Sequence, residues 1–236
     1  MASRLAARWA MSVPRWLAER ARTIGRSVES RAVHALTFGH GGPARLILGG
    51  FHGDEPKSVY AVRRLCEHLH EQAASDAGRR IVVVPVVNPD GYSRRRRKNA
   101  RGVDLNRNFP TGNWTALPAR SRFHGGTRPA AEPETRAVLS LIESVAPGEI
   151  ISVHSINRHR HCNNYDGPAR ELAGSMAACN GYPLTTTMGY PTPGSFGTWA
   201  GVERSIPTVT LELPSHHSPR RCWEDNCAAL LAGLAG

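Results

Sequence analysis

The pattern of apolar and polar positions predicts strands that alternate with helices. Residues 44–50 (ARLILGG) and 81–87 (IVVVPVV) are short apolar runs bounded by turn-forming residues. Two more runs follow at 149–154 (EIISVH) and 207–213 (PTVTLEL). We expect these segments to be strands, with Pro85 marking an edge, a bulge or a strand end, because proline cannot donate to the ladder.

Between these strands, apolar residues recur at the spacing of a helix. Such segments start near Asp54 and Pro133, run from about 168 to 179, and close the chain at about 223–234. Asp54 is the expected N-cap of the first helix. The alternation predicts an α/β fold, an α/β/α sandwich around a mixed, largely parallel central sheet.

The length of 236 residues suits a single core of this kind. We assign the domain to residues 25–236 and treat residues 1–24 as a basic N-terminal segment that frays. That segment lacks the apolar stretch of a secretory signal, and no apolar run approaches the roughly 18 residues of a membrane span. We therefore expect a cytoplasmic protein without a membrane partner.

The chain is basic, with 30 Lys and Arg against 19 Asp and Glu and a net charge of +11. The densest patch is the run at 94–98 (RRRRK). Such a charge favours anionic partners, either nucleic acid or a carboxylate-rich small molecule. Because no nucleic-acid motif surrounds the patch, we expect no nucleic-acid partner.

One constellation suggests a metal site. His52 and Glu55 form an HxxE motif directly after the first predicted strand, and His154 ends the third. Two histidines and one glutamate are the ligand set of catalytic zinc peptidases. The motif alone is weak, because 68–71 (HLHE) also matches it within a helix. Other histidines compete for the third position: His159, His161, His216 and His217.

Several motifs in a fixed order resemble the zinc carboxypeptidase family, the carboxypeptidase A-like enzymes. They are GGFHGDE at 49–55, NPDG at 88–91, GVDLNRNFP at 102–110, EPET at 132–135, SVH at 152–154 and TLEL at 210–213. The likeness runs from about Gly25 to the C-terminus. It implies the zinc carboxypeptidase fold and one Zn²⁺ per chain, with a metal-activated water that hydrolyses a C-terminal amide bond.

The resemblance also implies roles around the metal. The implied zinc ligands are His52, Glu55 and His154. Asp104 corresponds to the carboxylate that orients a ligating imidazole. Glu212 corresponds to the general base, although a glutamate in an apolar strand is also consistent with a buried ion pair. Arg97 corresponds to the arginine that polarises the scissile carbonyl. If the alignment with the family were shifted by one residue within the arginine run, Arg96 would take this position instead.

Other residues correspond to the substrate-binding groups of the family. Asn106 and Arg107 match the pair that holds the terminal carboxylate, for which a bidentate guanidinium is well suited. Tyr190 is the nearest match to a tyrosine that closes over the substrate. This match requires a one-residue gap in the alignment with the family. Phe196 falls where the larger enzymes read the substrate side chain, which predicts a pocket different from the type that accepts basic residues.

Within the family, GYPTPGSFGTW at 189–199 is most similar to short bacterial amidases that cut between γ-D-glutamate and meso-diaminopimelate in cell-wall peptides. The expected partner is therefore a small peptide with a free C-terminal carboxylate, a murein tripeptide. Alternatives are an N-acyl amino acid deacylase of the desuccinylase and aspartoacylase type, a non-catalytic peptide-binding module, and a nucleic-acid-binding protein.

Overall fold

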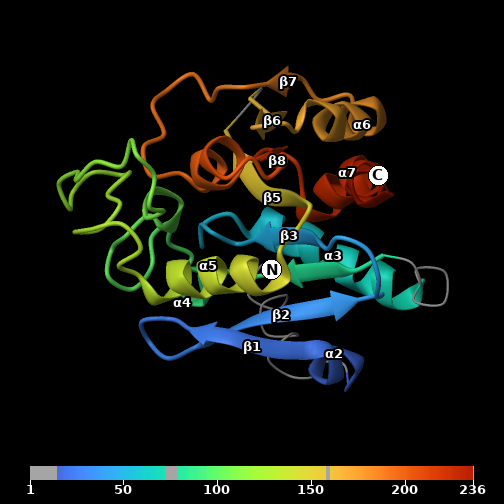
Figure 1. Ribbon diagram of the computed structural model, residues 1–236, viewed down its shortest axis with the longest axis horizontal. Coiled ribbons are helices and arrows are strands. Elements are labelled where there is room, and N and C mark those ends of the chain that lie inside the picture. The colour runs from blue at the N-terminus through green and yellow to red at the C-terminus, as the bar shows by residue number, and fades with distance from the viewer. Residues whose placement is uncertain (1–14, 73–78, 158–159, 236) are drawn as a thin grey trace.

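A single mixed sheet with helices on both faces forms the framework of the protein (Figure 1). The structure is a computed structural model that describes residues 15–72, 79–157 and 160–235. The expected frayed segment therefore lies outside the described residues up to position 14. From Ala21 onward that segment instead belongs to the sheet, ahead of the domain boundary expected at Gly25.

The described strands are β1 (Ala21–Arg26), β2 (Ala32–Phe38), β3 (Arg45–Gly49), β4 (Ile81–Val84), β5 (Glu149–Ile156), β6 (Cys162–Asp166), β7 (Leu184–Thr185) and β8 (Thr208–Pro214). They form one sheet in the order β1-β2-β4-β3-β5-β8-β6-β7. The central strands β4, β3, β5 and β8 are parallel, whereas β2 and β6 run antiparallel to their central neighbours. The predicted mixed, largely parallel sheet is confirmed.

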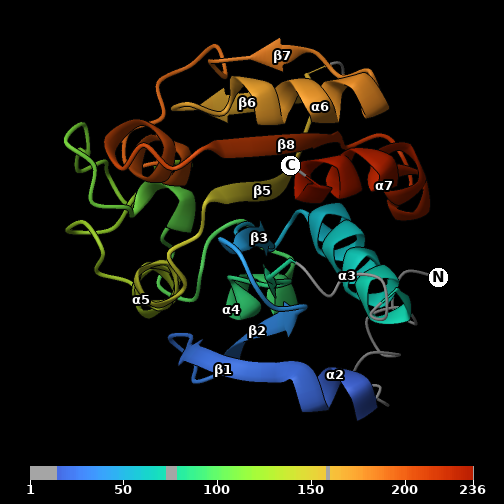
Figure 2. The ribbon, with the colours of Figure 1, turned by 45° about the vertical axis from the view of Figure 1, so that its right-hand side comes forward.

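The helices are α2 (Arg15–Arg20), α3 (Pro56–Glu71), α4 (Pro89–Arg94), α5 (Pro133–Val145), α6 (Arg170–Asn180) and α7 (Pro219–Ala235). Two further turns are the 3₁₀ segment η1 (Leu105–Arg107) and the π-helical segment η2 (Thr198–Glu203). Figure 2 shows α3 and α7 on one side of the sheet and α5 on the other.

Two apolar cores fill the spaces between these layers. Alternate residues of the central strands face opposite sides, so Ile47 packs with the α3–α7 layer and Leu46 with the α5 layer. Both residues are fully buried. Strands covered on both faces read as continuous apolar runs, which is why the sequence revealed them.

Some local expectations need correction. Strand β4 ends at Val84, directly before Pro85, as the proline predicts. Helix α3, however, begins at Pro56 with Glu55 as its N-cap, and no side chain caps it. Asp54 is not the cap because the chain turns one residue later, which keeps the Glu55 carboxylate available to the two histidines.

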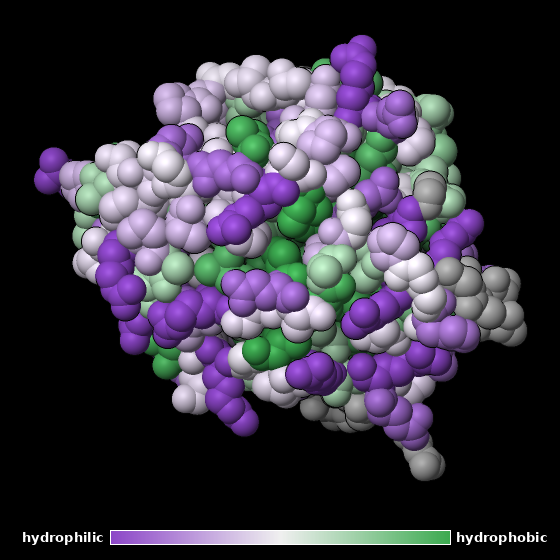
Figure 3. Space-filling model, in the orientation of Figure 1, coloured by the Kyte–Doolittle hydropathy of each residue, from purple (hydrophilic) through white to green (hydrophobic). Residues whose placement is uncertain are grey.

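No helix among the described residues is long and apolar enough to cross a membrane. On the face shown in Figure 3, strongly hydrophilic residues are interspersed with weakly polar and apolar ones. Within the basic run, Arg94 pairs with Glu29.

Candidate metal centre and active site

The parallel strands β3, β5 and β8 bring three distant segments together. His52 follows β3 by a short turn, and His154 lies near the end of β5, directly opposite Glu212 on β8. The carboxyl ends of neighbouring parallel strands share one edge of the sheet, which is where ligands bind in open α/β folds. The strand order thus brings His52, His154 and Glu212 to one edge of the sheet.

The turn that carries His52 packs tightly against α4. A Cβ at Gly53 would lie 2.0 Å from the carbonyl carbon of Gly91, so only glycine fits there. Asn88 ties the same segments together, because its Nδ2 lies 3.2 Å from the Phe51 carbonyl and 3.3 Å from the Arg97 carbonyl. The NPDG turn thus sets the position of the HxxE motif.

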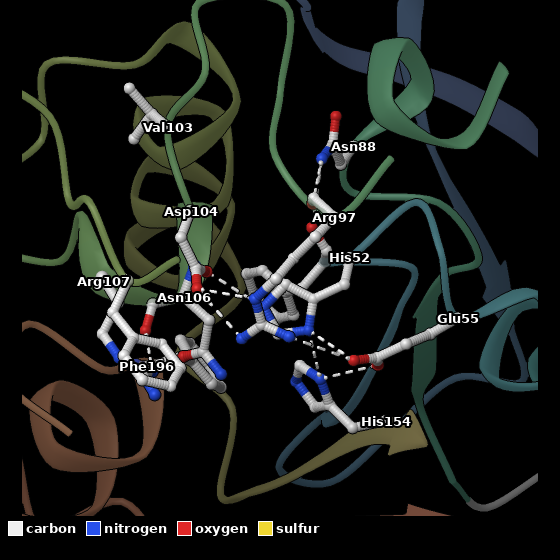
Figure 4. A network of polar contacts seen from close by, with 12 residues as sticks. His52, Glu55, Asn88, Arg97, Val103, Asp104, Asn106, Arg107, His154 and Phe196 are labelled. Carbon is white, nitrogen blue, oxygen red and sulfur yellow. Dashed lines mark hydrogen bonds and ion pairs between the residues drawn. The ribbon is translucent and has the colours of Figure 1, made fainter. Parts of the chain in front are cut away.

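His52, Glu55 and His154 converge on one point (Figure 4). The two Nδ1 atoms of the histidines lie 3.2 Å apart. Glu55 Oε1 lies 2.7 Å from His52 Nδ1, and its Oε2 lies 3.1 Å from His154 Nδ1. Among the described residues, this is the group of three ligating side chains whose geometry would hold an ion.

These distances fit a zinc ion. With bonds of about 2.0–2.2 Å to nitrogen and oxygen, tetrahedral ligands lie about 3.3 Å from one another. The observed separations of 2.7–3.2 Å are close to that value. Three protein ligands leave a fourth position for water or substrate, as in catalytic rather than structural zinc sites.

The charges of the site also favour a cation. His52 Nε2 lies 2.9 Å from Asp104 Oδ1, so carboxylates flank both nitrogens of its ring. Burial opposes protonation, yet Glu55 and Asp104 raise the pKa of His52 to about 9. A buried position that stabilises a positive charge between two carboxylates is suited to a metal ion, whose binding requires the neutral imidazole.

Asp104 also organises Arg97. Its Oδ2 accepts from Arg97 Nε at 3.0 Å and lies 2.9 Å from Nη2, while Nη1 lies 3.6 Å from Glu55 Oε1. Burial would raise the pKa of Asp104, but His52 and Arg97 hold it well below its usual range. Arg97 lines the cavity, whereas Arg96 is exposed, so the structure places Arg97 in the site.

Glu212 lies on the cavity wall beside the metal ligands. It alternates with Leu211 and Leu213, which belong to the core under α3 and α7, so its side chain points to the opposite face. Burial, and then the nearby Glu55 carboxylate, raise the pKa of Glu212 to about 8. A carboxylate whose pKa is raised toward neutrality is well matched to taking and returning a proton.

The segment η1 presents the predicted carboxylate-binding pair. Asn106 Oδ1 accepts from the backbone N–H of Phe196 at 2.8 Å, which anchors its amide at the cavity wall. Arg107 is 3% exposed, and its Nε has no hydrogen-bond partner among the described residues. Burial lowers the pKa of Arg107, which shows that its charge is poorly solvated and favours pairing with an anion.

Tyr190 lies at the cavity on a loop, as expected for a residue that contacts substrate. Its ring stacks on Phe123 with centroids 5.7 Å apart. Phe123 also lies under two guanidinium groups, those of Arg97 at 5.7 Å and Arg107 at 5.1 Å. The sequence analysis missed Phe123, because an isolated aromatic in a Gly- and Pro-rich region carries no periodic signal.

Phe196 does not have the expected position. Its side chain is 1% exposed, packs against Phe51, Phe109 and Trp199, and is not among the residues that line the cavity. The prediction that Phe196 reads the substrate side chain is therefore wrong. Its backbone faces Asn106, and its ring completes the aromatic core behind the site.

Comparison with known proteins agrees with this geometry. Residues 18–166 match the family described as zinc carboxypeptidase, which is more than half of the chain. The chain belongs to the zinc carboxypeptidase family. It is accordingly a zinc metallocarboxypeptidase, a hydrolase. The matched range includes His52, Glu55 and His154, and it ends before Glu212.

Relatives and solved structures support the same assignment. The chain is 38% identical over 188 residues to murein peptide amidase A of Escherichia coli K12, covering 72% of this chain and 70% of that protein. The Vibrio campbellii enzyme of the same name is 35% identical over 181 residues, covering 72% and 68%. The crystal structure of murein-tripeptide amidase from Escherichia coli O157 has a TM-score of 0.75 at 31% identity, covering 95% of this chain and 98% of that one.

A structure with lower sequence identity shows that the fold is shared. Carboxypeptidase A from Helicoverpa armigera superposes with a TM-score of 0.77 at 18% identity, over 92% of this chain and 68% of that one. The expected zinc carboxypeptidase fold is thus confirmed.

Proposed function

We propose that this carboxypeptidase hydrolyses the amide bond between γ-D-glutamate and a C-terminal meso-diaminopimelate in murein peptides. The observation that carries the reaction type is the convergence of His52, Glu55 and His154 beside Glu212. The substrate is inferred from the relatives named murein peptide amidase A and from the character of the cavity.

The cavity suits a small peptide with several charges. Its volume is about 550 Å³, and the metal site and Arg107 both open into it. Two more arginines, Arg122 and Arg160, line it as well. A murein peptide carries several carboxylates, and a strongly basic chain increases the rate at which such a ligand arrives.

Each polar group at the metal end has a part in the reaction. Arg107, with Asn106, binds the terminal carboxylate and so fixes which amide bond is presented. Arg97 donates toward the carbonyl oxygen, where negative charge develops. Its Nε and Nη2 are held by Asp104, and Nη1, which lies 3.6 Å from Glu55 Oε1, is the donor that we assign to the substrate.

Glu212 carries the proton in this scheme. It accepts a proton from the attacking water and returns it to the departing amine, so one carboxylate acts as base and then as acid. Zinc, when bound, supplies a Lewis acid for the carbonyl and lowers the pKa of water toward about 7. The three ligands and Asp104 are the residues that would hold it.

The decisive test is release of free diaminopimelate from L-Ala-γ-D-Glu-meso-diaminopimelate by the purified protein. We expect release that a chelator abolishes and zinc restores. The isomer with α-linked L-Glu in place of γ-linked D-Glu is the matched control, and we expect it to react at least about 100-fold more slowly, as a mispositioned amide does.

Other outcomes would redirect the assignment. Chelator-sensitive cleavage of ordinary C-terminal peptides or of N-acyl amino acids, without release from the murein peptide, would retain the zinc site and reject the substrate. Binding of the murein peptide with no hydrolysis by zinc-loaded protein would indicate a binding module.

A further inference from the structure

The chain between Arg97 and Asp104 forms an irregular loop beside the metal site. Both ends of the loop carry site residues, and the Arg97 guanidinium meets the Asp104 carboxylate with Nη2 2.9 Å from Oδ2 (Figure 4). The loop is neither helix nor strand. Other contacts must therefore fix its shape, because an irregular segment has no helical or ladder hydrogen bonds.

Asn99 supplies many of those contacts. Its backbone N–H donates to the Val103 carbonyl at 2.9 Å, and its carbonyl accepts from the Gly102 N–H at 3.0 Å. Its side-chain Oδ1 accepts from the N–H of Arg101 at 3.1 Å and from that of Val103 at 3.0 Å. One residue thus closes the turn from 99 to 103 through its backbone and its side chain.

The amide nitrogen of Asn99 anchors this turn to the start of α5. Its Nδ2 donates to Glu132 Oε2 at 2.8 Å and to Glu134 Oε2 at 3.2 Å. Asn99, Glu132 and Glu134 are 5%, 3% and 0% exposed, so little water competes for these bonds. A side-chain amide has two N–H donors and two acceptor lone pairs, and all of them are used here.

These three side chains lie behind the site rather than in it. They are not among the residues that line the cavity. The backbone N–H of Glu132 donates to Asn108 Oδ1 at 3.1 Å, which ties the cluster to the neighbour of Arg107 as well. Burying two carboxylates is costly, so a cluster that takes no part in the chemistry needs another task.

We propose that Asn99 is a positioning residue for the hydrolysis. Held by Glu132 and Glu134, it fixes the 97–104 loop so that the Arg97 guanidinium faces the substrate carbonyl. It touches neither the metal ligands nor the cavity. The proposal concerns the metallocarboxypeptidase reaction itself and does not depend on a murein peptide as the substrate.

The effect falls on Arg97 because Asp104 is held independently. The backbone N–H of Asp104 donates to the His124 carbonyl at 2.8 Å. The backbone of Arg97 has longer bonds, since its carbonyl accepts from Asn88 Nδ2 at 3.3 Å and from the Gly53 N–H at 3.4 Å. A displacement of about 1 Å in a catalytic group can cost about 100-fold in rate.

The test reverses the polarity of the contact between Asn99 and Glu132. Asn99→Asp keeps Oδ1 as an acceptor but places a third carboxylate against Glu132 and Glu134. We expect kcat for γ-D-Glu-meso-diaminopimelate to fall about 10–100-fold at saturating zinc, with KM changed by less than about 3-fold. The double variant Asn99→Asp/Glu132→Gln again pairs a donor with an acceptor, and its kcat should return to within about 3-fold of wild type.

A second background separates positioning from general damage. When Arg97→Ala is already present, adding Asn99→Asp should lower kcat by less than about 3-fold, because the group that Asn99 positions is missing. An equal loss in both backgrounds would overturn the proposal. So would a folded, zinc-loaded Asn99→Asp protein whose kcat Glu132→Gln does not restore.

Lys98 provides a matched control in the same loop. Its Nζ donates to the Ala119 carbonyl at 3.1 Å, and Lys98→Met should leave kcat unchanged. Thermal unfolding and zinc content are measured for every variant. If Asn99→Asp does not fold, Glu132→Ala decides: kcat should fall about 3–10-fold with KM unchanged, and a wild-type kcat would reject the proposal.

Failure of the proposed function gives a different pattern. If the wild type does not cleave γ-D-Glu-meso-diaminopimelate but cleaves N-benzoylglycyl-phenylalanine, the murein assignment fails by itself. The same variants are then compared on that peptide, and the proposal expects the same ratios of kcat, because Arg97 acts on the carbonyl of either substrate.

Discussion

The two ends of the cavity differ in how their charges are compensated. At the metal end, His52 lies between Glu55 and Asp104, and Asp104 in turn holds Arg97. On β6, Asp166 receives one hydrogen bond from the Asn164 amide and forms no ion pair among the described residues. The metal end is a closed network of opposite charges, whereas Asp166 is a carboxylate without a compensating charge.

The two regions therefore differ in how their side chains are fixed before any ligand binds. The groups that perform the reaction are fixed to strand ends and to each other before substrate arrives, which is the arrangement that electrostatic preorganisation requires. Asp166, by contrast, is held in place sterically, by Gly197 and Gly201, and has no charged partner among the described residues. Substitutions at the two ends should therefore have different signatures.

The largest effect is expected for a metal ligand. Glu55→Gln replaces a charged ligand and leaves His52 and His154 without the carboxylate between them. We expect zinc affinity to fall by at least about 10³, which exceeds the roughly 10–100-fold cost of losing an outer partner, with activity lost in parallel. Competition with a chromogenic chelator measures the affinity.

The second HxxE motif offers a matched control for this change. Glu71 occupies the corresponding position in His68–Glu71, at the exposed end of α3. Glu71→Gln should leave zinc content and turnover unchanged. Equal losses in the two variants would show that the motif does not act through the metal.

A smaller effect is expected one step from the metal. Asp104→Asn keeps a hydrogen-bonding side chain beside His52 Nε2 but removes the charge that orients the imidazole and anchors Arg97. Zinc affinity should fall by about 10–100-fold. Because Arg97 is released as well, kcat should remain depressed when zinc is saturating, and full recovery of kcat would contradict this double role.

At Asp166, substitution should stabilise the protein in a pH-dependent manner. The pKa of Asp166 is raised from 3.8 to about 6, so the folded chain binds its proton more tightly than the unfolded chain. Stability of the wild type therefore falls relative to Asp166→Asn as pH rises from about 4 to 6, and the difference is constant above.

We expect the Asn variant to gain about 3 kcal/mol at pH 7 and nothing below pH 4. Chemical denaturation at several pH values, with the metal removed, measures the difference. A gain that is independent of pH would mean that the carboxylate is not desolvated.

The smallest effect is expected at Phe123, in the cavity lining. Its ring lies against both Arg97 and Arg107 and stacks with Tyr190. Phe123→Leu removes a cation–π contact to each of the two arginines, each worth about 0.5–1 kcal/mol, so KM should rise about 5–30-fold with kcat little changed. Phe123→Tyr retains the face and should behave as wild type. An equal loss in both variants would assign the effect to packing.

Much of the framework could be predicted because its signal is local. The central strands are buried on both faces and read as apolar runs, and helices α3 and α5 show helical periodicity after a proline. The peripheral strands β1, β2, β6 and β7 escaped prediction. Strand β6 has the sequence CNNYD, whose polar residues pair with β8 and line the cavity rather than forming an apolar stripe.

The site residues also divide into those with a local sequence signal and those without one. His52, Glu55 and His154 were found through motifs at strand ends, and the structure brings their ligand atoms together. Asp166 and Phe123 were missed because their importance depends on what lies against them in space, two glycines in one case and two arginines in the other. Phe196 was misplaced because sequence position does not specify which face of a turn a side chain occupies.

The central claim is that a zinc site and Glu212 act together in hydrolysis. The most direct test is the turnover of γ-D-Glu-meso-diaminopimelate by wild type and Glu212→Gln at matched zinc content. The account predicts one zinc per chain in both proteins and a kcat lower by about 10²–10⁴-fold in the variant, because a general base typically contributes that factor to the rate. A zinc-loaded Glu212→Gln that keeps more than about a third of wild-type kcat would contradict it.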